Sequence, residues 1–297
     1  MKNGISGRTR VCGIFGCPIG HSFSPAMHNA AFTALSLDFV YVPFLVESEN
    51  LRAAVEAVKA LGLAGVNVTI PHKQAVMPLL DEVTESAALI GAVNTIVNQK
   101  GYLLGDNTDG NGFLRALEEE TRLTPTGKTV FILGAGGAAR AVAIQLALAG
   151  VKKVYLSNRS RERAEQLAAL ITKKTKAVAE VVSWPDGKEE DWRLTGALRS
   201  CDLVVQTTPI GMYPDNSLTL QLPEGIFRPG LVACDLVYNP VETLFLKSAR
   251  QAGATPMNGL GMLLYQGALS FEQWTGVPAP VEAMKKALIA SVYKLTG

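Results

Sequence analysis

Residues 129–139 read TVFILGAGGAA and decide the fold of the second half of the chain. The first five residues are apolar, β-branched or aromatic, which predicts a buried strand, and a small-residue helix is expected over Ala138–Leu148. Gly134 allows a tight turn, Gly136 lets the backbone approach a pyrophosphate, and Ala139 permits close packing of the helix on the strand. Because a helix N-terminus leaves N–H groups free for an anion, this order favours dinucleotide binding over a purely structural turn.

The next predicted strand decides between NAD and NADP. It covers Lys153–Ser157 and is followed by Asn158-Arg159-Ser160-Arg161-Glu162-Arg163, with no carboxylate at its tip. An NAD site usually has an acidic residue here for the ribose 2′-hydroxyl, whereas arginine binds a 2′-phosphate bidentately. A solvated basic helix start is the alternative, but the position one strand after the glycine turn favours NADP as the cofactor.

The composition is that of a globular protein. The chain has 297 residues, enough for two domains, of which 48% are hydrophobic and 18% charged, and this excludes a disordered chain. A net charge of +2 argues against a dedicated nucleic-acid-binding surface. The three histidines are too scattered for a metal site, so no metal is expected.

No segment of the sequence predicts a membrane span or a signal peptide. No stretch of ~18 residues is predominantly apolar, and the run Val11–Cys17 is short and has no cleavage pattern after it. The four cysteines form no C-x-x-C pair and lie in apolar, strand-like runs, as free thiols do in a reducing compartment. We therefore expect a cytoplasmic protein that binds neither nucleic acid nor membrane.

Strands and helices alternate in both halves, which predicts an α/β fold with parallel, doubly wound sheets. The helix after the first strand has Ser24 as its expected N-cap. The predicted strands of the first half are Val11–Cys17, Phe39–Val46, Ala64–Ile70 and Val93–Asn98, with helices over Pro25–Leu37 and Leu51–Leu61; those of the second half include Leu203–Gln206 and Leu231–Val237, with a final helix over Pro280–Leu295.

Three segments of the first half carry polar side chains where strands end. They are Gly20–Pro25, Asn67–Lys73 and Gly105–Gly110, rich in hydroxyls and amides, and they suit a small, polyhydroxylated ligand. Lys73 is the candidate proton donor, because a lysine is charged near neutral pH and can donate to a forming alkoxide. Asp109 is expected to orient it, with a solvated surface lysine as the alternative.

The ordered motifs of the chain resemble the shikimate dehydrogenase family over nearly its whole length. They are Pro18–Pro25 (PIGHSFSP), Asn67–Lys73 (NVTIPHK), Gly91–Thr95 (GAVNT), Asn107–Asp109 (NTD), Gly134–Ala138 (GAGGA), Asn158–Ser160 (NRS), Thr208–Met212 (TPIGM), Asp235–Pro240 (DLVYNP) and Gly259–Met262 (GLGM) with Gln266. Cys17 and Gln206 depart from the usual pattern, and neither stands at a position with assigned chemistry.

The resemblance implies two α/β domains and an enzyme. Residues 1–112 would form a substrate-binding and catalytic domain with a parallel-rich sheet, residues 113–258 a Rossmann-type NADP-binding domain, and residues 259–297 helices that return to the first domain. The implied reaction is the reversible NADPH-dependent reduction of 3-dehydroshikimate to shikimate in chorismate and aromatic amino-acid biosynthesis.

The resemblance also assigns roles to single residues. Ser22 and Ser24 would bind the substrate carboxylate with Tyr238 nearby, and the ring hydroxyls would contact Thr69, Lys73, Asn94, Asp109 and Gln266. The NADP-binding residues would be Gly134, Ala135, Gly136, Gly137, Ala138, Asn158, Arg159, Ser160 and Arg163, with Leu236 and Gly259 near the nicotinamide and Glu85 as a further cofactor-side residue. Lys73 and Asp109 would be the catalytic pair.

Two alternative functions stay open at this point. The related quinate/shikimate dehydrogenases, which use NAD or NADP, share most of these motifs. A protein on the same fold that only senses NADP would not need the Lys73–Asp109 pair. A homodimer is one assembly that the resemblance allows.

Overall fold

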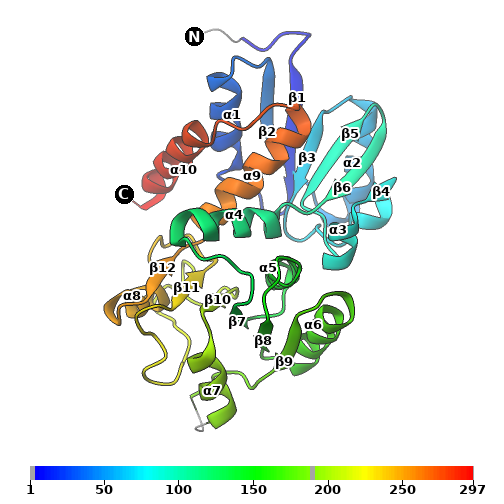
Figure 1. Cartoon of the computed structure of the whole chain (residues 1–297). Helices are drawn as coiled ribbons and strands as arrows, with labels where there is room; N and C mark the ends of the chain where they lie inside the picture. The colour runs from blue at the N-terminus through cyan, green and yellow to red at the C-terminus, as the bar shows by residue number, and fades with distance from the viewer. Residues whose placement is uncertain (1–3, 188–190, 297) are drawn as a thin grey trace. The chain divides into compact units, whose positions relative to one another are not determined.

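The protein divides into two compact units in the computed structural model, which describes residues 4–187 and 191–296 (Figure 1). Unit 1 comprises residues 1–112 and 264–297, and unit 2 comprises residues 113–263. The chain passes from one unit to the other inside helices α4 (Asp109–Thr121) and α9 (Leu260–Thr275).

Unit 1 is built on a six-stranded mixed sheet in the order β2-β1-β3-β5-β6-β4. Its strands are β1 (Arg10–Gly16), β2 (Phe39–Leu45), β3 (Gly65–Val68), β4 (Glu82–Val83), β5 (Thr95–Gln99) and β6 (Tyr102–Asp106); its helices include α1 (Ser24–Ala34), α2 (Leu51–Ala60), α3 (Glu85–Ile90) and α10 (Val281–Thr296), with 3₁₀ turns at Ser48–Asn50 and Met77–Leu79. Strands β2, β1 and β3 are parallel, as expected.

The β5–β6 hairpin departs from the predicted alternation of strand and helix. Strand β5 runs antiparallel to both β3 and β6. Lys100 and Gly101 connect it to β6 with φ of 56° and 97°. Two residues with positive φ form the turn that matches the twist of a two-residue hairpin. The prediction of a parallel-rich α/β domain is confirmed, but not that of an unbroken parallel order.

The predicted capping role of Ser24 is wrong. Helix α1 begins at Ser24 itself after Phe23, which makes no side-chain capping bond, and Ser24 is buried. The helix also ends at Ala34, earlier than predicted, since Ser36 takes a left-handed φ of 52°. The serine side chain is therefore available for contacts other than the helix end.

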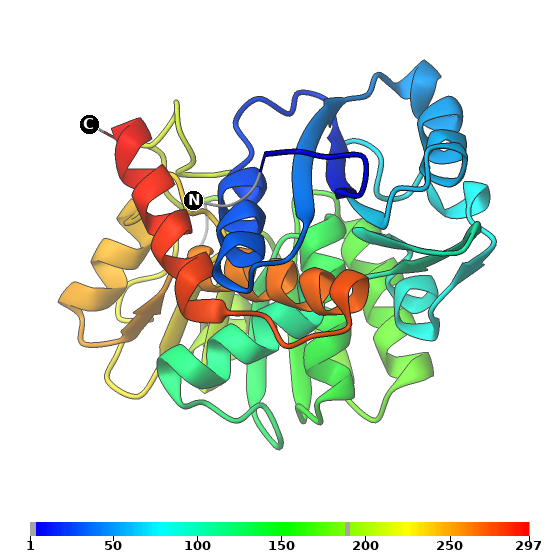
Figure 2. The ribbon, with the colours of Figure 1, turned by 90° about the horizontal axis from the view of Figure 1, so that it is seen from above.

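Helices cover both faces of the unit 1 sheet. Leu51, Val55 and Val58 of α2 pack in one cluster with apolar residues of β1, β3, β5 and β6. On the other face, Phe271 of α9 packs against Phe32 of α1 with ring centroids 5.2 Å apart, and α10 lies beside α1 (Figure 2). The segment after residue 263 thus belongs to the core of unit 1.

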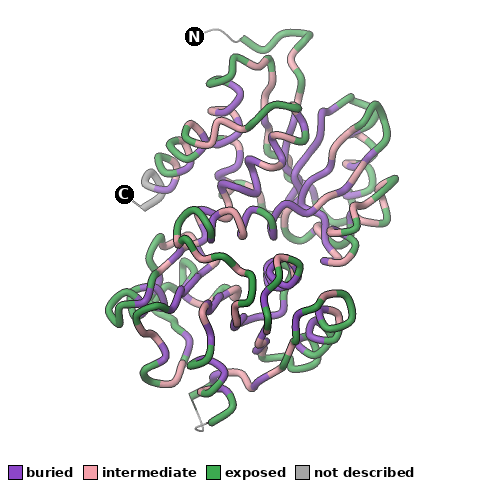
Figure 3. Tube along the Cα trace, viewed as in Figure 1, coloured by how far each residue is buried: buried purple, intermediate pink, exposed green. Residues whose placement is uncertain are grey.

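Unit 2 has a fully parallel six-stranded sheet in the order β12-β11-β10-β7-β8-β9. Its strands are β7 (Thr129–Leu133), β8 (Lys153–Ser157), β9 (Val178–Val181), β10 (Leu203–Gln206), β11 (Val232–Asp235) and β12 (Thr255–Met257); its helices include α5 (Gly137–Leu148), α6 (Arg161–Lys174), α7 (Trp192–Ser200) and α8 (Leu244–Gln251). The inner strands are buried (Figure 3).

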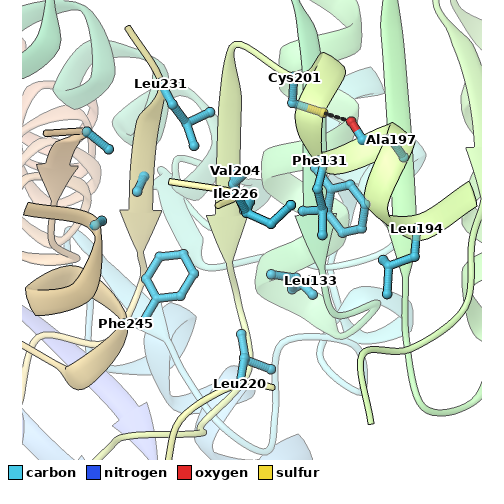
Figure 4. Close-up of a cluster of buried hydrophobic side chains, with 14 of the residues drawn as sticks. Phe131, Leu133, Leu194, Ala197, Cys201, Val204, Leu220, Ile226, Leu231 and Phe245 are labelled. Atoms are coloured by element: carbon cyan, nitrogen blue, oxygen red, sulfur yellow. Dashed lines mark hydrogen bonds between the residues drawn. The ribbon is translucent and has the colours of Figure 1, made fainter. Parts of the chain in front are cut away.

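The core of unit 2 explains why its strands read as continuous apolar runs. Phe131 and Leu133 of β7 cluster with Leu194 of α7 and Phe245 of α8 (Figure 4). The alternate residues of β7 are equally buried, because helices α5 and α6 contact the sheet as well. A parallel sheet buried on both faces needs apolar residues at every position.

Candidate active site

Lys73 and Asp109 form a close ion pair in unit 1. Lys73 Nζ lies 2.6 Å from Asp109 Oδ2, with 28% of the lysine side chain and 10% of the aspartate side chain exposed. Lys73 lies in the loop after β3, and Asp109 begins α4 directly after β6. The helix N-terminus favours a carboxylate at this position. The ammonium group is thus held at a fixed point and remains accessible to a ligand.

Asn94, which directly precedes strand β5, hydrogen-bonds to the carboxylate of the ion pair. Its Nδ2 donates to Asp109 Oδ1 at 2.8 Å, so the two carboxylate oxygens have different partners. The amide of Asn107 supports the same turn, because its Oδ1 accepts from the Asp109 N–H at 3.1 Å. These bonds leave the carboxylate of Asp109 little freedom to rotate away from Lys73.

Gln266 joins this group from helix α9. Its Oε1 accepts from Asn94 Nδ2 at 3.3 Å, and the residue is 9% exposed. The approach of α9 to α4 depends on Gly112, since a Cβ there would lie 2.5 Å from the Gln266 nitrogen. The structure therefore brings together four of the predicted site residues, Lys73, Asn94, Asp109 and Gln266.

The predicted carboxylate-binding serines lie together at the start of α1. The Ser24 N–H donates to Ser22 Oγ at 3.3 Å, and Ser24 is also a hydrogen-bond partner of the Tyr41 side chain. Thr69 lies after β3 and is half-buried. Its side chain packs against Gly16, because a Cβ added to Gly16 would lie 2.5 Å from Thr69 Cγ2.

Two further predicted residues, Glu85 and Tyr238, belong to different units. Glu85 is exposed at the first position of α3. Tyr238 belongs to unit 2, where burial raises the pKa of its hydroxyl. Within residues 4–187 and 191–296, no side-chain hydrogen bond joins Thr69 or Glu85 to the Lys73–Asp109 pair.

The glycine turn of unit 2 has the geometry that a dinucleotide phosphate needs. Gly134 has a φ of +117°, and a Cβ there would lie 2.3 Å from Thr207 Oγ1. Gly136 is the N-cap residue of helix α5 and Gly137 is its first residue, and a Cβ at either position would meet nothing within 4 Å. Ala138 is exposed beside them. Open space against the first N–H groups of a helix fits a pyrophosphate.

The segment after β8 contains two exposed arginines that form no ion pair with the described residues. Arg159 and Arg163 are exposed, and neither has an ion-pair partner in the part of the chain that the structure describes. Arg161 differs, because its Nε donates to Glu165 Oε1 at 2.8 Å. Asn158 Nδ2 donates to the Ser160 carbonyl at 2.8 Å and shapes the turn. Free arginines at this strand tip fit a 2′-phosphate.

Buried polar side chains at the end of β11 hold the loop that follows this strand. Asp235 Oδ2 accepts from Thr243 Oγ1 at 2.6 Å, and burial raises the pKa of this carboxyl to about 6. Gln206 Nε2 donates to Asp235 Oδ1 at 3.3 Å. Gly259 packs against the backbone of Leu236, where a Cβ would lie 2.1 Å from the Leu236 carbonyl oxygen.

Comparisons with known proteins identify the family of this fold and site. Residues 14–96 match the shikimate dehydrogenase substrate binding domain, residues 117–185 the shikimate/quinate 5-dehydrogenase family, and residues 259–289 the shikimate 5′-dehydrogenase C-terminal domain. Shikimate dehydrogenase (NADP⁺) of Desulforamulus reducens is 52% identical over 290 residues, which are 98% of each chain. The chain belongs to the shikimate dehydrogenase family.

Solved structures of shikimate dehydrogenases match nearly the whole chain. The enzyme from Listeria monocytogenes, in complex with shikimate and NAD, is 39% identical with a TM-score of 0.91 over 96% of this chain and 98% of that one. The enzyme from Thermus thermophilus, in complex with NADP(H) and shikimate, is 36% identical with a TM-score of 0.83 over 95% and 100%.

A cluster of three buried hydroxyl side chains adjoins the site of this shikimate dehydrogenase family member. The cluster was not predicted from the sequence. It consists of Thr95, Thr108 and Ser270, each at most 1% exposed, and all three hydrogen-bond to one another. Thr95 and Thr108 stand inside recognised motifs, and Ser270 lies one helical turn after Gln266. Their positions beside assigned residues are the only sequence signal that could have found them.

In residues 4–187 and 191–296, no group of three His, Cys, Asp or Glu side chains is arranged to hold a metal ion. Over the same ranges, no helix has the length and apolar character needed to cross a membrane. All four cysteines are free thiols.

Proposed function

We propose that this member of the shikimate dehydrogenase family is an NADP-dependent oxidoreductase that interconverts 3-dehydroshikimate and shikimate. This reaction would serve chorismate and aromatic amino-acid biosynthesis. The observation that carries the proposal is the ion pair between Lys73 and Asp109, held 2.6 Å apart and partly open to a ligand. A protein that only bound the cofactor would not need it.

The chemistry follows from the position of the ammonium group. NADPH supplies a hydride to the carbonyl carbon of 3-dehydroshikimate and leaves as NADP⁺. Lys73 then donates a proton to the alkoxide oxygen, so that the ketone becomes the hydroxyl of shikimate. Asp109 keeps the ammonium group oriented through their 2.6 Å ion pair. In the reverse direction Lys73 accepts the hydroxyl proton.

The other residues of unit 1 would hold the substrate. Ser22 and Ser24 supply two hydroxyls for its carboxylate, and Tyr238 of unit 2 is assigned to the same end of the substrate. Thr69, Asn94 and Gln266 are assigned to the ring hydroxyls, and Asn94 and Gln266 belong to the hydrogen-bonded group that includes Asp109. We therefore assign substrate binding and catalysis to residues 1–112 with the C-terminal helices.

Unit 2 would bind NADP. The open glycine turn takes the pyrophosphate, through Gly134, Ala135, Gly136, Gly137 and Ala138. The 2′-phosphate is bound by Asn158, Arg159, Ser160 and Arg163. Leu236 and Gly259 are assigned to the nicotinamide end, and Glu85 of unit 1 is the remaining cofactor-side assignment. The absence of a carboxylate at the tip of β8 supports NADP over NAD.

Initial rates in four combinations test this function. Shikimate or quinate is oxidised with NADP⁺ or NAD⁺, and absorbance of the reduced cofactor is followed. The proposal predicts a high rate only with shikimate and NADP⁺. Equal rates with quinate would favour the second candidate, a quinate/shikimate dehydrogenase, which the family match over residues 117–185 also includes. No turnover in any combination would favour a sensor of NADP.

Location and assembly are further proposals. We place the enzyme in the cytoplasm, which the free thiols of Cys12, Cys17, Cys201 and Cys234 support because reducing compartments keep thiols unpaired. A homodimer stays a prediction, and light scattering of the purified protein decides it by a mass of one or two chains.

A further inference from the structure

We infer that Thr108 is a positioning residue of the Lys73–Asp109 pair and that it acts through the side chain of Asn94. This inference rests on the proposed function, since it concerns the same ion pair. Thr108 is 1% exposed and directly precedes Asp109 in the chain. It is assigned no ligand contact, so its role has to be read from the bonds that it makes inside the protein.

The orientation of the Asn94 amide is set by the backbone of Thr108. The Thr108 N–H donates to Asn94 Oδ1 at 2.8 Å. A backbone N–H can only donate, so the oxygen of the amide must occupy the position next to the Thr108 nitrogen, and the NH₂ group takes the other position. That NH₂ group donates to Asp109 Oδ1 at 2.8 Å. A flipped amide would instead place an oxygen against the carboxylate.

The Thr108 hydroxyl contacts both ends of the same amide. It accepts from Asn94 Nδ2 at 2.9 Å and lies 3.2 Å from Asn94 Oδ1, so it helps to hold the amide that the backbone N–H orients. Since Asn94 is only 2% exposed, a lost partner here cannot be replaced freely by water. The amide, and with it Asp109, is therefore held by a residue that makes no hydrogen bond to Lys73 among the described residues.

Thr95 and Ser270 both hydrogen-bond to the Thr108 hydroxyl. Thr95 Oγ1 lies 2.7 Å from Ser270 Oγ, and each of the two lies 3.3 Å from Thr108 Oγ1. Asn67 Nδ2 donates to Ser270 Oγ at 3.0 Å and ties helix α9 to strand β3. Each hydroxyl both donates and accepts, so the cluster satisfies its buried polar atoms only as a unit.

The arrangement predicts a loss of turnover and not of binding when the hydroxyl is removed. Thr108→Val keeps the volume and the backbone N–H but removes one partner of the Asn94 amide. One neutral hydrogen bond corresponds to a loss of about three- to tenfold in kcat. The KM for shikimate and for NADP⁺ should change less than about twofold, because the inference assigns Thr108 no ligand contact. Thr108→Ser restores the hydroxyl and should restore kcat.

The test compares kcat and both KM values for wild type, Thr108→Val and Thr108→Ser, with Thr275→Val as a matched control. Thr275 is half-buried and its hydroxyl donates to the Phe271 carbonyl at 2.8 Å, away from Asn94. We expect only Thr108→Val to lose turnover. A wild-type kcat in Thr108→Val, or an equal loss in Thr108→Ser, would overturn the inference.

A second readout does not depend on activity. Hydrogen exchange of the Asn94 side-chain amide, followed by NMR, should be faster in Thr108→Val than in wild type and unchanged in Thr275→Val. Unchanged exchange in Thr108→Val would overturn the inference. If the wild-type protein oxidised no shikimate, the proposed function would fail, and the exchange measurement would still decide whether Thr108 fixes the amide.

Discussion

His28 stacks on Tyr41 with ring centroids 4.3 Å apart and an angle of 7° between the rings. The histidine is fully buried in unit 1, and within the described residues neither ring nitrogen has a hydrogen-bond partner. Burial without a partner disfavours the charged ring and lowers the pKa of His28 to about 3. This histidine is a neutral, aromatic member of the core, and its titration couples folding to pH.

The sign of that coupling follows from the two pKa values. The unfolded chain binds a proton at His28 near the ordinary value of 6.5, whereas the folded chain binds it only near 3. Stability from this group is therefore complete above pH 6.5 and is lost as the pH falls towards 3. Near pH 5 the loss is about 2 kcal/mol, since each unit of pKa difference corresponds to about 1.4 kcal/mol.

Replacing His28 by phenylalanine should remove this part of the pH dependence. We expect the free energy of unfolding to fall by about 2 kcal/mol less between about pH 7.5 and about pH 5 in His28→Phe than in wild type. Urea unfolding followed by the fluorescence of Trp274, 5.3 Å from His28, measures it once Trp184 and Trp192 are replaced by phenylalanine. The exposed His21, replaced in the same way, is the control. An identical pH dependence in His28→Phe and wild type would show the burial argument to be wrong.

Arg159 should decide the preference for NADP. Its exposed guanidinium has no ion-pair partner among the described residues, so it is free for the 2′-phosphate. A hydrogen bond to a charged group is worth about 1.5–3 kcal/mol, so Arg159→Ala should raise the KM for NADP⁺ roughly tenfold or more. The KM for NAD⁺ should stay unchanged.

The matched control for this prediction is Arg161→Ala. Arg161 is equally cationic and two residues away, but it pairs with Glu165. Its replacement should leave the KM for NADP⁺ within about twofold of wild type. If both variants raised that KM equally, general positive charge and not a specific phosphate contact would explain the effect.

Gly136 should be needed for the cofactor and not for folding. A Cβ there meets nothing within 4 Å, and asparagine is a favourable residue at the position before a helix. Gly136→Asn should therefore keep the melting temperature of the cofactor-free protein while weakening NADP⁺ binding by roughly tenfold or more, about 1.4 kcal/mol. Gly7→Asn, also in open space, is the control. Normal NADP⁺ affinity in Gly136→Asn would place the pyrophosphate elsewhere.

The Rossmann-type sheet of unit 2 could be predicted because its pattern is local. Strands β7, β8 and β10 have the predicted bounds, since a strand buried on both faces is a continuous apolar run that ends at a turn. The β5–β6 hairpin was not predicted, because the alternation of strands and helices in the sequence favours parallel strands joined by helices. Here the turn Lys100-Gly101 joins two antiparallel strands directly.

The site was predictable to the extent that it lies at strand ends. Lys73 follows β3, Asn94 directly precedes β5 and Asp109 begins α4, and hydrogen bonds join the three side chains. Ser270 could not be found in this way, because its partner Asn67 is 203 residues away in the sequence. A buried serine on an apolar helix has no local pattern that distinguishes it from a solvent-exposed one.

Asp109→Asn should reduce turnover less than removal of the lysine does. Asparagine keeps the shape of the side chain, but its single oxygen can accept from only one of Lys73 Nζ and Asn94 Nδ2, which bond to different oxygens of the carboxylate. If the carboxylate only orients the ammonium group, its loss should lower kcat by about tenfold, the cost of one charge-assisted hydrogen bond. A loss as large as that in Lys73→Ala would show instead that Asp109 shares the transferred proton.

The turnover number of Lys73→Met in shikimate oxidation with NADP⁺ tests the central claim most directly. Methionine keeps much of the volume of lysine but can donate no proton. General acid–base catalysis contributes about 10²–10⁴-fold, so kcat should fall by that factor while the dissociation constant for shikimate changes far less. A near-normal turnover number with weakened shikimate binding would contradict the account, because the proton would then have to come from water or from another group.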